Sequence, residues 1–215
     1  MFITFEGPDG SGKSTLTTEL IIRLLKEKPS LKYVLTREPG GKGIAEAEKI
    51  RDIILNNESN ISAMSEALLY TASRRIHLER VIWPALQENK LVLCDRYIDS
   101  FYAYQGYARD LGIDFVKKIT ELVIENTIPD ITIYLDITEE QSEFRRGVLR
   151  GIADRLDGES GEFHKKVING YKELLKADPD RFIIIDGWQS KEAVAEEVYN
   201  KLMQNAKFRA IWDKQ

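Results

Sequence analysis

The sequence predicts an α/β fold in which a five-stranded parallel sheet is covered by helices on both faces. Short apolar runs alternate along the chain with stretches whose apolar residues recur at helical spacing. This alternation is typical of a parallel sheet that is buried on both sides. The chain has 215 residues and no low-complexity linker, which suits one domain.

Composition excludes several classes of function. With 43% hydrophobic and 31% charged residues, the chain can bury an ordinary globular core. The net charge of −4 argues against a broad nucleic-acid surface. The single cysteine, Cys94, excludes an internal disulfide framework and a multi-cysteine metal site. There is no signal peptide and no apolar run that could span a bilayer. We therefore expect a soluble cytoplasmic protein without membrane or nucleic-acid partners.

Residues 7–15 fit the motif G-x-x-x-x-G-K-[ST]. An apolar run, residues 1–5, precedes them, and leucines at helical spacing follow, so the motif has the strand–turn–helix setting of a P-loop. Its glycines let backbone N–H groups surround phosphates at a helix N-terminus. We predict a P-loop three-layer sandwich with a lid loop, and an ATP site made of Gly7, Pro8, Asp9, Gly10, Ser11, Gly12, Lys13, Ser14 and Thr15.

Two residues of this region and one distant carboxylate suit phosphate and metal chemistry. Lys13 can bridge the terminal phosphates, and the Ser14 hydroxyl can ligate Mg²⁺. Asp95 ends an apolar strand in the position of a Walker-B acid, where it can hold Mg²⁺ directly or through water. Alternatively, Asp95 only pairs with a neighbouring arginine.

Local signals define the other elements. After the first helix stops at Lys28-Pro29-Ser30, apolar runs predict strands at 33–36, 91–94, 131–137 and 182–185. Helical spacing predicts helices at 44–55, 62–86 and 114–126, the second with Ser62 as N-cap and with Pro84 near its end. A capping box at Thr138 and a cap at Ser190 begin two further helices, and the last runs to about residue 203. Glycines among charges predict a mobile loop at about 150–161.

Two arginines and an aromatic residue suggest a second ligand beside the P-loop. Arg37 and Arg96 directly follow predicted strands, where parallel sheets bind ligands, and arginine suits bidentate phosphate recognition. Tyr70 and Arg74 are four residues apart and share a helix face, where a ring and a guanidinium can stack on a base and bond its edge. For Arg37 and Arg96, the strand-end positions favour a phosphate role over solvated charges. Spacing alone favours ordinary packing and a surface charge for Tyr70 and Arg74.

The sequence resembles the thymidylate kinase (dTMP kinase) family in its bacterial form, from residue 2 to about residue 200. The shared segments occur in the family's order, and they are Phe5-Glu6-Gly7-Pro8-Asp9-Gly10-Ser11-Gly12-Lys13-Ser14, Thr36-Arg37-Glu38-Pro39-Gly40-Gly41, Tyr70-Thr71-Ala72-Ser73-Arg74-Arg75, Asp95-Arg96-Tyr97, Ala103-Tyr104-Gln105-Gly106 and Asp154-Arg155. Three features depart from the family pattern: a longer spacing between Gly41 and Ile50, Phe101 in place of a serine, and a longer C-terminal tail.

The resemblance assigns roles at the acceptor site. It implies that Arg37 and Arg96 hold the monophosphate acceptor and that Tyr70 stacks on thymine. Arg74 and Gln105 match residues that hydrogen-bond the edge of the base.

Further roles also come from the resemblance. Asp9 matches an acidic position associated with the deoxyribose 3′-hydroxyl, and Arg51 looks like another substrate-side arginine. Because the P-loop lacks an arginine, the lid is expected to supply a cation, with Arg150 as first candidate and Arg155 as second.

The resemblance implies the reaction ATP + dTMP giving ADP + dTDP with Mg²⁺, in deoxythymidine nucleotide biosynthesis. Lys13, Arg96, Asp9 and Arg150 would form the catalytic group within a kinase domain at 1–205, with the lid at about 150–161 and a tail at 206–215. Family analogy implies a homodimer. Two alternatives are another nucleoside or nucleotide kinase, and a nucleotide-dependent switch without turnover.

Overall fold

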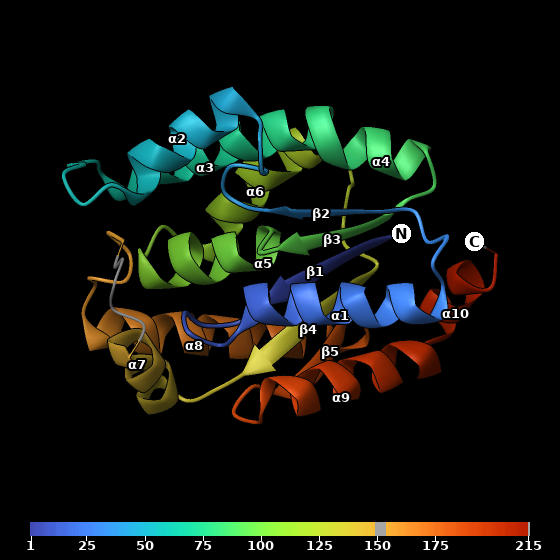
Figure 1. Cartoon of the computed structure of the whole chain (residues 1–215). Coiled ribbons are helices and arrows are strands. Elements are labelled where there is room, and N and C mark those ends of the chain that lie inside the picture. The colour runs from blue at the N-terminus through green and yellow to red at the C-terminus, as the bar shows by residue number, and fades with distance from the viewer. Residues whose placement is uncertain (149–153, 215) are drawn as a thin grey trace.

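The computed structural model describes residues 1–148 and 154–214. A five-stranded parallel sheet has the strand order β2-β3-β1-β4-β5, and every strand was predicted to within one or two residues. The strands are β1 (Phe2–Glu6), β2 (Tyr33–Arg37), β3 (Leu91–Asp95), β4 (Ile131–Asp136) and β5 (Phe182–Asp186). Their carboxyl ends lie at one edge of the sheet, on the side of α7 in Figure 1.

Helices cover both faces of the sheet, which confirms the predicted α/β architecture (Figure 1). The α-helices are α1 (Lys13–Glu27), α2 (Ala45–Leu55), α3 (Ala63–His77), α4 (Trp83–Gln87), α5 (Ile98–Phe101), α6 (Ile113–Ile124), α7 (Glu139–Val148), α8 (Gly161–Ala177), α9 (Lys191–Gln204) and α10 (Ala206–Trp212). Two π-helical segments, η1 (Leu78–Ile82) and η2 (Tyr102–Ala108), and a short 3₁₀ turn, η3 (Pro179–Arg181), complete the described elements.

Each face of β1 packs into a different apolar cluster. Ile3 and Phe5 lie in the cluster covered by α1, α9 and α10, whereas Phe2 lies in the cluster that includes α3, α6 and α8. Because successive strand residues point to opposite faces, both layers of the sandwich are anchored on this central strand.

The expected helix starts at Ser62, Thr138 and Ser190 are confirmed. The Ser62 and Ser190 hydroxyls accept from backbone N–H groups three residues on, at 3.1 and 3.2 Å. Thr138 and Gln141 form the reciprocal bonds of a capping box, at 3.2 and 2.9 Å.

The expected helix at 62–86 is continuous, but it is not a single α-helix. It passes from α3 through η1 into α4, and Pro84 lies in the first turn of α4. Since proline has no N–H to donate and its ring clashes with the preceding turn, a π turn directly before it relieves the conflict without ending the helix.

Ala206–Trp212 form α10, which packs on the α1 and α9 face. Phe208 is buried, and Trp212 stacks on it with ring centroids 5.7 Å apart. Lys28, at the end of α1, donates to the Trp212 carbonyl oxygen. Within the described residues, no helix has both the length and the apolar character needed to cross a membrane.

Candidate active site

A cavity of about 370 Å³ lies where the P-loop meets the carboxyl ends of β2 and β3. The sequence-predicted residues that line it are Asp9, Gly10, Gly12, Lys13, Ser14, Thr15, Arg37, Arg51, Tyr70, Arg74, Asp95, Arg96 and Gln105. Segments that are far apart in the sequence therefore converge on one cavity. Gly7, Pro8 and Ser11 lie in the same loop and contact the Lys13 side chain, while Arg150 lies outside the described residues.

The P-loop turns sharply between β1 and α1. Gly7 has φ of +141°, and a Cβ there would lie 2.7 Å from the Leu135 carbonyl oxygen, so only glycine fits. The Lys13 ammonium donates to the Gly7 and Pro8 carbonyls at 3.1 and 2.8 Å. Burial, and next the positive charge of Arg96, lower the pKa of Lys13 to about 8.

Two oxygen-bearing side chains meet where the start of α1 faces the end of β3. The Ser14 hydroxyl donates to Oδ2 of Asp95, which joins the P-loop helix to the end of β3. A hydroxyl and a carboxylate fit Mg²⁺, which keeps several waters and is held by few protein ligands together with substrate phosphates. The described residues contain no group of three or more His, Cys, Asp or Glu side chains that could hold a metal ion by themselves.

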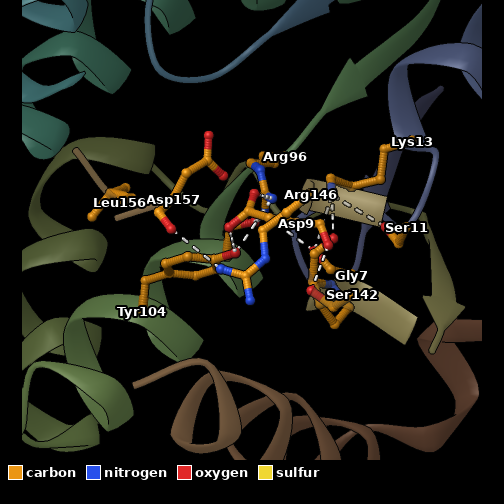
Figure 2. A network of polar contacts seen from close by, with 12 residues as sticks. Gly7, Asp9, Ser11, Lys13, Arg96, Tyr104, Ser142, Arg146, Leu156 and Asp157 are labelled. Carbon is orange, nitrogen blue, oxygen red and sulfur yellow. Dashed lines mark hydrogen bonds and ion pairs between the residues drawn. The ribbon is translucent and has the colours of Figure 1, made fainter. Parts of the chain in front are cut away.

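Arg96 is fixed by contacts with several elements (Figure 2). Its backbone is left-handed, with φ of +69°, an uncommon conformation for a residue with a side chain. Nη1 donates to the Gly7 carbonyl at 3.1 Å and to Ser100 Oγ at 3.0 Å. Nη2 donates to Asp9 Oδ1 at 2.5 Å. The guanidinium is therefore positioned before any ligand arrives.

Asp9 is held between Arg96 and a tyrosine. The Tyr104 hydroxyl donates to Asp9 Oδ2 at 2.6 Å and lies 3.4 Å from Arg96 Nη2 (Figure 2). Burial opposes the charge of this carboxyl, but Arg96 and then Lys13 outweigh it and lower the pKa of Asp9 to about 2. Asp9 is thus ionised near neutrality.

Glu6, the last residue of β1, accepts hydrogen bonds from residues next to Arg96. Its carboxylate accepts from Tyr97 N at 2.7 Å, Ser100 Oγ at 2.5 Å and Tyr171 OH at 2.9 Å. Burial, and next the charge of Asp99, raise the pKa of Glu6 to about 7.

Arg37, at the end of β2, and Arg51, on α2, also line the cavity. Arg37 Nη2 donates to Glu48 Oε2 at 2.7 Å, and Arg51 Nη1 donates to the Pro39 carbonyl at 2.9 Å. Burial, and next the nearby charge of Arg37, lower the pKa of Arg51. The longer spacing after Gly41 therefore still brings Arg51 to the cavity, beside Arg37.

Arg74 lines the cavity and is 1% exposed. Nε donates to Glu38 Oε2 at 2.8 Å and Nη2 to the Tyr97 carbonyl at 3.3 Å. Its Nη1 is buried and has no hydrogen-bond partner among the described residues. His77 is bonded to Glu38 and Thr36 and has a structural position.

Three other residues that line the cavity, Tyr70, Phe101 and Gln105, carry no charge. The rings of Tyr70 and Phe101 lie 6.1 Å apart, and both line the cavity. Phe101, where the family has serine, also lies under the Arg74 guanidinium at 5.0 Å. The Gln105 amide donates from Nε2 to Glu66 Oε1 at 2.9 Å. A flat ligand with a polar edge fits these surroundings.

A second cavity, of about 380 Å³, lies on the other side of the P-loop and is lined by Gly12, Thr15 and Arg145 among others. Arg145 Nη1 donates to the Gly10 and Ser11 carbonyls at 3.2 and 3.3 Å. Its guanidinium carbon lies 4.7 Å from the centre of the Trp188 ring.

The second lid candidate, Arg155, does not contact the P-loop. Its Nε donates to the Ile54 carbonyl at 2.8 Å, and its Nη2 pairs with Glu66. Besides Lys13 and Arg96, Arg145 on α7 contacts carbonyls of the P-loop. Sequence reasoning missed Arg145, Glu6, Tyr104 and Glu66. Tyr104 and Glu6 lie within motifs that the sequence pointed to, whereas Arg145 and Glu66 carry no signal beyond their positions in helices.

The fold and the site together are those of a P-loop nucleotide kinase: a phosphate-binding loop faces a second set of arginines across one cavity. The model of the family described as "Thymidylate kinase" matches residues 5–198. The chain therefore belongs to the thymidylate kinase family of phosphotransferases.

Similar proteins agree with this assignment. A thymidylate kinase from Mycoplasmopsis agalactiae is 64% identical over 212 residues, covering 99% of each chain. One from Staphylococcus haemolyticus is 45% identical over 206 residues, covering 94% of this chain and 97% of its own. The crystal structure of thymidylate kinase from Ehrlichia chaffeensis has a TM-score of 0.77 at 34% identity, covering 95% of this chain and 98% of its own.

Proposed function

We propose that this protein is a dTMP kinase that transfers the γ-phosphoryl group of ATP to dTMP, giving ADP and dTDP, in deoxythymidine nucleotide biosynthesis. One observation carries the proposal: the P-loop and the arginines Arg37, Arg51 and Arg96 line the same cavity from different walls. Two phosphate-binding groups facing each other suit transfer between phosphates.

The donor would bind at the P-loop. Its phosphates would lie against the backbone N–H groups of the P-loop, to which Pro8 contributes none, and the start of α1. The second cavity, with Arg145 above Trp188, is our candidate for the adenosine part. Ser14 and Asp95 would hold Mg²⁺, which neutralises phosphate charge when bound.

The acceptor phosphate would be held by Arg37, Arg51 and Arg96, and the sugar 3′-hydroxyl by Asp9. The rings of Tyr70 and Phe101 would enclose the base.

The base edge would be read by Arg74 and Gln105. Arg74 lines the cavity, and its guanidinium would be the donor. The Gln105 amide, whose Nε2 is engaged with Glu66, offers its oxygen as an acceptor. Thymine presents the complementary pair, a carbonyl oxygen at C4 and an N3–H, which supports thymine as the base.

The catalytic demand is electrostatic. The acceptor is an anionic phosphate oxygen near neutral pH, so no strong general base is needed. Lys13 and the preorganised Arg96 would reduce repulsion between donor and acceptor and stabilise charge on the transferring group. A cation from the lid, with Arg150 as first candidate and Arg155 as second, would complete this group and exclude water.

By family analogy we also propose that the enzyme acts in the cytoplasm as a homodimer, which sedimentation of the full chain would test. The reaction is tested by ADP release with ATP, Mg²⁺ and a panel of nucleoside monophosphates. We expect multiple turnovers with dTMP and much less with purine monophosphates or dCMP. Turnover with a different monophosphate alone would reassign the substrate, and nucleotide binding without any turnover would indicate a switch.

A further inference from the structure

Several polar contacts converge on Glu66, a residue to which the proposed mechanism gives no role. Glu66 lies in the first turn of α3 and is 1% exposed. Oε1 accepts from Gln105 Nε2 at 2.9 Å and from Arg109 Nε at 3.1 Å. Oε2 accepts from Arg109 Nη2 at 3.2 Å and from Arg155.

The surroundings of Glu66 keep it ionised. Burial alone would raise the pKa of this carboxyl, but hydrogen bonds from Arg109, Arg155 and Gln105 outweigh burial and hold the pKa below its ordinary value. An ionised carboxylate has no proton to donate, so both of its oxygens act only as acceptors.

This property fixes the orientation of the Gln105 amide. A glutamine side chain has an oxygen at one side and an NH₂ group at the other, and the two are nearly isosteric, so its neighbours decide which way it points. Beside an acceptor, only the NH₂ group is stable. The Gln105 oxygen is therefore turned away from Glu66, and Gln105 lines the cavity.

The orientation of this amide separates two pyrimidines. Thymine carries a hydrogen at N3 and needs an acceptor there, while cytosine carries a lone pair at N3 and needs a donor. At the neighbouring position thymine has an oxygen and cytosine an amino group, and a guanidinium donor from Arg74, which lines the cavity, suits only the oxygen. A reversed Gln105 amide would present a donor to N3 and would therefore no longer favour thymine at that position.

We propose that Glu66 is a positioning residue for base specificity: by accepting from Gln105 it presents the amide oxygen to the base and so favours thymine over cytosine. The proposal rests on the proposed function, because it takes a pyrimidine monophosphate as the acceptor. Glu66 lies behind Gln105 and acts only through it.

The test is a double-mutant cycle read out as the ratio of kcat/KM for dTMP to that for dCMP. In Glu66→Gln the new amide can also donate, so Gln105 can turn, and the ratio should fall about tenfold, mostly through the KM for dTMP. In the Gln105→Ala background the same Glu66→Gln change should leave the ratio unaltered, because the group through which it acts is gone.

Arg109→Lys is the matched control. It keeps a cation beside the carboxylate and leaves the Gln105 contact in place, so the ratio should stay near that of the unchanged protein. Thermal unfolding checks that each variant is folded. Should Glu66→Gln not fold, Glu66→Asp withdraws the carboxylate by one methylene and should lower the ratio in the same Gln105-dependent way.

The outcomes separate the two proposals. An unchanged protein that phosphorylates dTMP no better than dCMP would overturn the proposed function. A protein that prefers dTMP, but whose ratio is unmoved by Glu66→Gln or falls equally in the Gln105→Ala background, would overturn only the role of Glu66. Isothermal titration with dTMP and dCMP gives the same comparison without turnover.

Discussion

Arg96 Nη2 and Asp9 Oδ1 lie 2.5 Å apart, so the acid of the P-loop and the arginine that follows β3 form one unit. The Gly7 carbonyl, which accepts from Arg96 Nη1, strengthens the same connection. The P-loop and the end of β3, which border the same cavity, are therefore coupled through protein groups. In an enzyme that aligns two phosphates, such preorganisation reduces the rearrangement needed at the moment of transfer.

Lys13→Ala should nearly abolish phosphoryl transfer while the protein stays folded. The change removes the P-loop ammonium, which we expect to act on the charge that develops between the phosphates. Steady-state ADP release and a thermal melt measure the two effects. Lys26→Ala, an exposed position on the same helix, is the control and should behave normally. Near-normal turnover in folded Lys13→Ala would falsify the ATP-site assignment.

The pKa of Lys13 predicts an alkaline limb in the pH profile. Because this pKa is lowered to about 8, the free enzyme should lose the ammonium above that pH, and kcat/KM for ATP should then fall about tenfold per pH unit.

Unfolding is not the cause expected for this limb. The folded pKa of Lys13 lies below its ordinary value of 10.5, so the unfolded chain binds more protons between about pH 8 and 10.5. This group therefore makes the free energy of unfolding rise with pH in that window. Thermal melts at each pH separate the effects, and a flat kcat/KM profile up to pH 10 would contradict the assignment.

Gln105→Ala should weaken dTMP use and leave ATP affinity largely intact. Loss of its contacts is expected to cost about 1–3 kcal/mol in acceptor binding, because buried groups are left unpaired. Kd values from titration with each nucleotide measure this. Loss of ATP affinity with normal dTMP affinity would show that our division of the two sites is wrong.

Arg74→Ala should have the same specificity effect together with a loss of stability. The variant leaves Glu38, which is 5% exposed, without its arginine partner. Breaking a buried pair in this way costs about 3–5 kcal/mol, which denaturant unfolding would measure. A fully stable Arg74→Ala protein would show that His77 alone can satisfy Glu38.

Arg150→Ala should lower kcat strongly and change ground-state ATP affinity much less, if this residue supplies the lid cation in the transition state. Arg155→Ala is the comparison, because Arg155 is engaged with Glu66 and Ile54. Pre-steady-state transfer and ATP binding would be measured for both. Unchanged kcat in Arg150→Ala would move the role to Arg155 or remove it from the lid.

Much of the fold was predictable because its signals are local. Five apolar runs, a P-loop and three caps depend on neighbouring residues, and all of them appear in the structure. The π-helical segments were not predicted. In η2 nearly every side chain is buried, so its sequence lacks the alternation of polar and apolar faces that marks a helix.

The candidate site divides in the same way. Residues at strand ends, such as Arg37 and Arg96, could be placed because topology sends them to one edge of the sheet. Glu66 and Arg145 could not be placed, since their importance comes from tertiary contacts with partners about 40 and 135 residues away in the chain. The sequence identified Arg155 as a candidate residue, but it did not predict its contacts with Ile54 and Glu66.

Glu38 connects the strand end that carries Arg37 to the helix that carries Arg74. It directly follows Arg37 and accepts from both Arg74 Nε and His77 Nδ1, at 2.8 and 3.1 Å, so the end of β2 and the helix α3 are locked together. Arg37, which we propose for the phosphate, and Arg74, which we propose for the base, are therefore held at a fixed distance from each other. We expect this distance to select nucleotides by the length between their phosphate and the far edge of their base. A purine monophosphate should then be excluded by its length alone, whatever hydrogen bonds its base could form.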